Sequence, residues 1–141
     1  MTEPSAKLRD PVRRVKLSVA EMSELASDEQ CRAIIHELQR GMGSEQRMGV
    51  GTFESLLGVL GLSGAVDATI RKRLLALQQL RHVIVHRASK VDKRLVTACP
   101  WLRLKVGSQL RVNHREVMAY MIAAIQYTTI LKGRLYGAYA K

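Results

Sequence analysis

The segment from Asp67 to Arg87 constrains this chain most, because nothing in it interrupts a helix. It contains neither Pro nor Gly, and its apolar residues recur every three or four positions, as Ile70, Leu74, Leu77, Leu80 and Ile84. That period places them on one face of an α-helix. The sequence therefore predicts a helix of about 20 residues, roughly 30 Å long, with four polar residues off the apolar stripe: Arg71, Arg73, Gln78 and Arg81.

Capping patterns predict further helix starts before this segment. Ser18–Glu21 and Ser27–Gln30 match the capping box, in which a hydroxyl accepts a free amide of the first turn and an acidic or amide side chain reaches back. A helix, or a broken pair of helices, is expected to follow them. After the Gly-rich connector GMGSEQRMGVG, Thr52 is expected to cap a short helix that stops at Gly61 or Ser63.

The pattern changes after Ala88. Pro100 and Gly107 predict an irregular insert in which LRLKV and QLRVN form short extended segments about a turn at Gly107. A third capping box, Asn113–Glu116, then starts the last helix. Its packing stripe is interpreted as core: Val117, Met121, Ala124, Thr128, Leu131 and Leu135.

Composition supports an all-α fold. Apolar residues make up 47% of the 141 residues but aromatics only 4%, so the core must be mostly aliphatic. We predict a bundle of four to five helices with a short irregular or hairpin insert before the last helix. Residues 1–16 are expected to form a basic lead-in and residues 17–141 one helical domain. Trp101 is expected to fill the bundle rather than to stack on a base.

The sequence also suggests a compartment. Cys31 and Cys99 lie far apart and fit two buried thiols in a reducing cytosol. The N-terminus shows no apolar segment of a secretory signal, and no stretch approaches the roughly 18 apolar residues that span a bilayer. We therefore expect a cytoplasmic protein without a membrane partner.

Positive charge is concentrated in residues 71–105. The whole chain has 23 Lys and Arg against 12 Asp and Glu, a net charge of +11. In this window ten basic residues stand against one acid, Asp92, so it carries 10 − 1 = +9. Such a field attracts polyanions, of which nucleic acid is the commonest, although a basic surface also serves solubility alone.

Arg81, His82 and His86 lie in this window within the otherwise apolar stretch RHVIVH. One interpretation is structural, a helix that packs one face and exposes the other. The second is chemical, because histidine exchanges protons near neutral pH and the arginine fork binds two phosphate oxygens. Together they are sufficient to cleave a ribose–phosphate bond without a metal.

Helical spacing limits that idea. Residues 82 and 86 share a face, whereas residues 81 and 86 point about 140° apart around an ideal helix. Either the helix loosens near Val85, or a second copy across a two-fold axis completes a composite cleft. The histidine pair lacks nearby Cys or carboxylate partners, so we expect neither a metal nor another cofactor.

The same residues carry a resemblance to a known family. Arg81, then His82, three residues and His86, followed by Arg87 and Val91–Asp92, resembles the motif of the HEPN domain (higher eukaryotes and prokaryotes nucleotide-binding). The likeness extends over roughly residues 52–135. It includes TFESLLGVLGL upstream and, downstream, elements similar to a bacterial branch of the family: Pro100, Leu102 and Gly107–Leu110.

This resemblance implies a helical bundle that dimerises with its motif helices facing each other, and a metal-independent endoribonuclease of toxin–antitoxin or phage-defence systems. Arg81 would bind the phosphate, His86 would be the general acid and base, and His82 would orient the site. An antitoxin or another regulatory protein is a further partner that the family implies. The RNA backbone would be held by basic residues around the motif: Arg71, Lys72, Arg73, Arg87, Lys90, Lys93 and Arg94.

The sequence departs from the family pattern at two places, and two alternative functions remain open. Ala88 stands where HEPN toxins paired with minimal nucleotidyltransferases carry a modified Tyr, which puts that control route in doubt, and Ala88–Ser89 replaces a Gly-rich turn. The first alternative is a catalytically inactive HEPN module that binds RNA or a protein. The second is a helical DNA-binding or assembly protein, for which the connector before Thr52 is too long and Gly-rich a turn.

Overall fold

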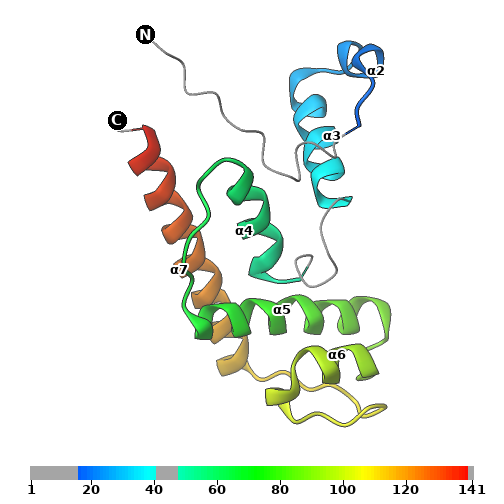
Figure 1. Cartoon of the computed structure of the whole chain (residues 1–141). Helices are drawn as coiled ribbons and strands as arrows, with labels where there is room; N and C mark the ends of the chain where they lie inside the picture. The colour runs from blue at the N-terminus through cyan, green and yellow to red at the C-terminus, as the bar shows by residue number, and fades with distance from the viewer. Residues whose placement is uncertain (1–15, 41–47, 140–141) are drawn as a thin grey trace. The chain divides into compact units, whose positions relative to one another are not determined.

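A computed structural model describes residues 16–40 and 48–139 of the chain, which are mostly helical (Figure 1). The prediction of an all-α fold is confirmed, since the described residues form no strand and one isolated bridge. The predicted lead-in falls almost wholly outside the described residues. The elements are α2 (Val19–Ser23), α3 (Ser27–Arg40), α4 (Val50–Val59), α5 (Ala68–His86), α6 (Lys93–Ala98), the short 3-10 helix η2 (Pro100–Leu102) and α7 (His114–Tyr139).

These elements fall into two compact units. The first comprises residues 16–40 and 51–64, and the second comprises residues 48–50 and 65–139. In the first unit the Gln30 side-chain amide joins α2 to α3 by donating to the carbonyls of Met22 and Leu25, each at 2.9 Å. Gly61, in the left-handed region at φ 71°, ends α4 as expected.

The predicted helix starts in the first unit are only partly right. α2 begins after Ser18 but the hydroxyl makes no capping hydrogen bond. α3 begins at Ser27, and the Glu29 carboxylate accepts the amide of the preceding Ala26 at 3.2 Å. Thr52 is not a cap, because α4 has already started at Val50.

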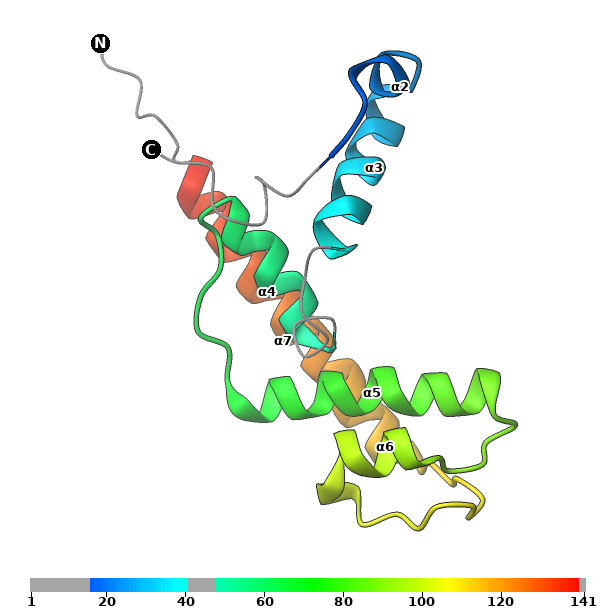
Figure 2. The same ribbon diagram turned by 45° about the vertical axis from the view of Figure 1, so that its right-hand side comes forward.

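The second unit is built on α5, which has the predicted bounds. The Asp67 carboxylate caps it by accepting the amides of Thr69 at 2.8 Å and Ile70 at 3.3 Å. These backbone hydrogen bonds lower the pKa of Asp67. α7 crosses α5 and α6 lies alongside it, as Figure 2 shows.

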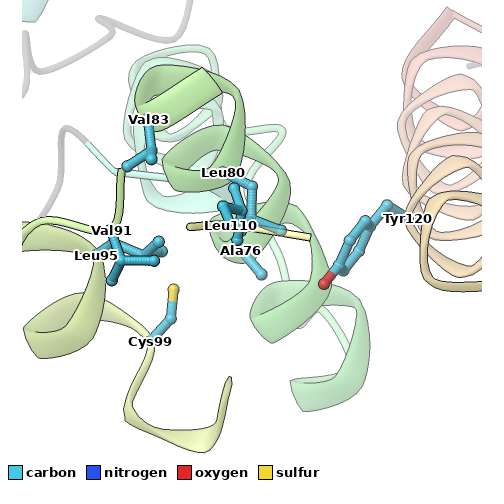
Figure 3. Packing of buried hydrophobic residues seen from close by; sticks show 8 residues of the cluster. All are labelled: Ala76, Leu80, Val83, Val91, Leu95, Cys99, Leu110 and Tyr120. Carbon is cyan, nitrogen blue, oxygen red and sulfur yellow. The ribbon is translucent and has the colours of Figure 1, made fainter. Parts of the chain in front are cut away.

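The predicted apolar stripe of α5 is partly wrong. Ile70 and Leu80 are buried, but Leu77 and Ile84 are 37% and 47% exposed. The helix serves two clusters on different sides of its axis. Ile70 packs with Val50 and Tyr127, whereas further along Ala76, Leu80 and Val83 enter the larger cluster with Val91, Leu95, Cys99, Leu110 and Tyr120 (Figure 3).

The predicted irregular insert is confirmed, but a short helix precedes it and the two predicted segments do not pair as a hairpin. Residues 93–98 form α6, capped by the Asp92 carboxylate, which accepts the Leu95 amide at 2.8 Å. A turn does occur at Gly107, at φ 84°. Its arm pairs with the segment after α5 instead of with LRLKV: the Val91 amide donates to the Ser108 carbonyl at 3.0 Å, and the Gly107 amide to the Val91 carbonyl at 2.7 Å.

The capping box of α7 is confirmed in both directions. The Glu116 amide donates to the Asn113 side chain and the Asn113 amide to the Glu116 carboxylate, each at 2.9 Å. The predicted stripe is partly wrong, because Val117, Met121 and Leu135 are exposed, although Leu131 packs against the cluster around Tyr127. The buried residues of α7 lie at neighbouring positions: Tyr120, Ala123 and Tyr127.

Two single-residue expectations are also wrong. Trp101 does not fill the core, since 39% of it is exposed. Cys31 is exposed, whereas Cys99 is buried as expected. Desolvation raises the pKa of the Cys99 thiol to about 11.

Candidate active site and nucleic-acid interface

The end of α5 carries the motif residues of the candidate site. Arg81 and His86 are exposed and His82 is partly exposed. The two imidazole rings lie beside each other, with centroids 5.0 Å apart and planes tilted by 47°. The expected shared face of residues 82 and 86 is therefore present, and it opens to solvent.

Arg81 lies on another side of the helix from His86. α5 stays α-helical through His86, and the Arg87 amide still donates to the Val83 carbonyl at 3.0 Å. The loosened helix end that would bring these two side chains together is absent. At 100° per residue they leave the axis about 140° apart, with Cα atoms roughly 9 Å apart. One helix alone does not bring guanidinium and imidazole onto the same phosphate.

Within the described parts of the chain, no hydrogen bond or ion pair holds Arg81, His82 or His86. A catalytic imidazole ordinarily has a partner that fixes its orientation. The chain thus offers the reactive groups, and the described residues offer no group to orient them beyond the ring contact between the histidines.

Apolar side chains surround Arg81 on the exposed side of α5. Leu77, Ile84 and Val85 are 37%, 47% and 57% exposed. By helical periodicity all three lie within about 60° of Arg81 around the axis. An arginine flanked by exposed aliphatic residues is a feature that sequence reasoning missed, because helical spacing groups Leu77 and Ile84 with the buried Ile70 and Leu80.

The seven predicted phosphate-binding residues all lie in the second unit, but their surroundings differ. Arg71 donates from Nε to the Val66 carbonyl at 3.2 Å. Lys72 places Nζ 5.7 Å from the ring centroid of Trp101. Arg87 pairs at 3.9 Å with Asp92. Arg73 is partly exposed, and the remaining three are exposed: Lys90, Lys93 and Arg94.

The second unit carries the whole net charge of the protein. Residues 65–139 contain 14 Lys and Arg and three acids, so 14 − 3 = +11, which equals the net charge of the full chain. The positive and negative charges of the remaining residues therefore cancel. A polyanion would thus be attracted strongly to the part of the chain that holds the motif.

Other kinds of site find little support in the described ranges. No three His, Cys, Asp or Glu residues there lie close enough to share a metal ion. A cavity beside Tyr120 measures about 40 Å³, against roughly 300–1,000 Å³ for small-molecule sites. No helix in residues 16–40 and 48–139 has the length and apolar character to cross a membrane.

Two of the perturbed groups in the second unit belong to its core and not to the motif. Burial raises the pKa of the Tyr120 hydroxyl, the Glu116 carboxylate adds to the rise, and Arg73 opposes it. The Tyr120 hydroxyl points from α7 toward α5 in Figure 3. The raised pKa values of Tyr120 and Cys99 therefore reflect their burial in the core cluster.

Comparison with family models, with curated proteins and with solved structures gives no match to this chain. We therefore infer its function from its own residues.

Proposed function

We propose that this protein is a metal-independent endoribonuclease of the HEPN type, with Arg81 and His86 as its catalytic residues. The observation that carries the proposal is the exposed ring contact of His82 and His86, with Arg81 exposed on the same part of α5, inside the unit whose described residues carry a charge equal to the net charge of the chain. Proton-transfer and phosphate-binding groups thus lie where an RNA backbone is attracted.

The proposed reaction needs only these groups. His86 removes the proton from a ribose 2′-OH, and the 2′-oxygen attacks the adjacent phosphorus. The bond from phosphorus to the 5′-oxygen breaks, and the His86 imidazolium gives its proton to that oxygen. Arg81 holds the phosphate oxygens, on which negative charge develops in the transition state. The products are a 2′,3′-cyclic phosphate and a 5′-hydroxyl.

A second copy of the chain completes the proposed site. The divergence of Arg81 and His86 on a regular helix requires a further element to bring a guanidinium to each imidazole. The exposed aliphatic residues around Arg81 supply an apolar surface for that contact. In a two-fold dimer through the ends of α5, Arg81 of one copy faces His86 of the other across a cleft.

The bacterial branch that the motif resembles suggests a cellular role. Within this proposal the protein acts in the cytoplasm as a toxin or phage-defence effector, and an antitoxin or another regulatory protein restrains it. Its RNA contacts are the phosphates held by the seven basic residues of the second unit named above.

A binding module without catalysis is the second candidate. It is favoured by one observation, the lack of an orienting hydrogen bond on Arg81, His82 or His86 within the described residues. Such a protein would hold RNA or a protein partner through the same surface without cleaving the RNA.

Incubation of purified protein with a mixed RNA substrate in EDTA separates the two candidates. We expect the parent to cleave the RNA to 2′,3′-cyclic phosphate ends and Arg81→Ala and His86→Ala to lose that activity. His36→Ala and Arg115→Ala are matched controls, because both residues are exposed and lie outside the motif. Binding without cleavage by the parent would instead support the module, and cleavage at parental rate by His86→Ala would refute the proposed site.

A further inference from the structure

Trp101 is held at the surface by residues that are themselves anchored. It lies in η2, directly after Cys99, which is 1% exposed, and before Leu102, which packs against the larger core cluster. Backbone hydrogen bonds close the turn around it, from the Leu102 amide to the Cys99 carbonyl at 3.0 Å and from the Arg103 amide to the Pro100 carbonyl at 3.2 Å. The indole is therefore exposed on a rigid turn, not on a loose loop.

One cationic side chain lies at the indole, and a second follows it in the sequence. The ammonium of Lys72 lies 5.7 Å from the ring centroid, a cation–π distance. Arg103, exposed and in the left-handed region at φ 50°, follows Trp101 by two residues. An exposed aromatic ring next to cations, in a unit with a net charge of +11, is the combination that binds single-stranded nucleic acid.

We propose that Trp101 is a stacking platform for an unpaired base of the bound RNA, with Lys72 holding the neighbouring phosphate. This inference rests on the RNA-binding part of the proposed function and not on cleavage. A base that stacks on the indole replaces water on an apolar face, and the Lys72 ammonium, which lies over the ring, is within reach of the phosphate of that nucleotide.

The proposal specifies a single-stranded substrate. Bases inside an A-form duplex are stacked on one another and their faces are closed to a protein side chain, whereas loops and ends offer free faces. From Lys72 to His86 the axis of α5 rises about 21 Å. An unpaired segment of several nucleotides is long enough to contact both the indole and the candidate active site.

The single Trp of the chain makes the test direct, because tryptophan fluorescence then reports on Trp101 alone. We would titrate the full-length His86→Ala protein, which leaves the RNA intact in the proposed mechanism, with a fluorescein-labelled single-stranded RNA and with a blunt duplex of the same sequence. Anisotropy of the label gives the Kd, and quenching of the indole reports the stacking. Trp101→Ala, Trp101→Phe and Tyr136→Ala are compared in the same background, Tyr136 being an aromatic residue 74% exposed on α7.

We expect single-stranded RNA to quench the fluorescence of the indole, and the Kd from this quenching to equal the Kd from anisotropy. Trp101→Ala should weaken single-strand binding by about 5- to 150-fold, which corresponds to roughly 1–3 kcal/mol. Trp101→Phe should retain most of the affinity, and Tyr136→Ala and all duplex affinities should change less than about twofold. Lys72→Ala should reduce the slope of log Kd against log salt by about one.

Two results would overturn the proposal, and they differ from failure of the proposed function. RNA binding without indole quenching, or an equal loss for single strand and duplex in a Trp101→Ala protein with parental circular dichroism, contradicts stacking alone. No binding of either RNA by the parent background contradicts the proposed function, and the stacking proposal with it.

Discussion

Replacement of Leu95 by Ala tests whether the larger core cluster stabilises α6 and the exposed turn at Trp101. Leu95 is 0% exposed and is the largest side chain of the unit that is fully buried. Figure 3 shows it between α5 and α6, next to Val91 and Cys99. The cluster fixes α6 and, through Cys99, the η2 turn that exposes Trp101. A cavity at Leu95 therefore removes support from the proposed RNA surface.

The magnitude follows from what is removed. Leu→Ala deletes three carbon atoms, worth about 0.8 kcal/mol each, or roughly 2.4 kcal/mol in transfer free energy. A cavity term adds to this wherever the surroundings cannot collapse, and fully buried leucines in general lose about 2.7–5 kcal/mol. Because Leu95 lies between two helices, we expect a loss of about 3–4 kcal/mol in the free energy of unfolding.

Urea unfolding followed by the fluorescence of Trp101 measures this value for the second unit, which contains the single Trp. Thr97→Ala is the matched control, an exposed position of the same helix at which we expect a change within about 0.5 kcal/mol. A loss below about 1 kcal/mol for Leu95→Ala, or one no larger than that of the control, would refute the packing described here.

Three further predictions concern α7, the turn after α5 and the thiols. Asn113→Ala should lower the free energy of unfolding by about 0.5–2 kcal/mol, because the Glu116 amide loses its acceptor. An unchanged urea midpoint would contradict this prediction. Ala88→Gly should raise it by about 0.5–1 kcal/mol, since Ala88 is exposed at φ 48° and glycine relieves that conformation; a lower midpoint would be the contrary result. Native protein should react at one thiol, Cys31, and not at Cys99. Because folding raises the pKa of Cys99 from 9.0 to about 11, the native state keeps a proton there that the unfolded state has lost. The free energy of unfolding should accordingly fall as the pH rises from 9.0 to about 11, and it should fall less in Cys99→Ala. Two fast-reacting thiols in the native protein, or the same pH dependence of stability in Cys99→Ala and the parent, would contradict this prediction.

The parts of the fold that local signals encode were predictable from sequence. The absence of Pro and Gly between Asp67 and Arg87 predicted the bounds of α5 within one residue, and the structure adds the Asp67 cap. The reciprocal pair Asn113 and Glu116 gave the start of α7. In both cases the deciding hydrogen bonds join residues two or three positions apart, so the information lies in adjacent sequence.

The packed faces were not predictable, for two physical reasons. α7 is apolar on most of its circumference, with Met118, Ile122 and Ile125 exposed, so helical spacing alone allows several stripes. α5 serves two clusters, and a search for one stripe merges Ile70 with residues that face elsewhere. Which face is covered depends on elements far along the chain.

The candidate site, like the fold, was predictable from sequence only in part. The exposure of Arg81 and the shared face of His82 and His86 followed from their spacing. The exposure of Trp101 did not, because it depends on how η2 packs against α6 and how α6 packs against α5. α6 itself was missed, since it has six residues and ends next to Pro100.

Mixing of two inactive variants tests the central claim most directly, that Arg81 and His86 form one ribonuclease site between two copies of the chain. Arg81→Ala and His86→Ala are unfolded together, refolded as a mixture, and assayed in EDTA beside the parent and each variant alone. Half of the dimers are then mixed, and each mixed dimer has one of its two sites intact, which predicts about one quarter of parental activity. The mixture should release 2′,3′-cyclic phosphate ends at that level while each variant alone stays inactive. An active parent with no recovery in the mixture would contradict the shared site, and a parent that binds RNA without cleaving it would contradict the ribonuclease.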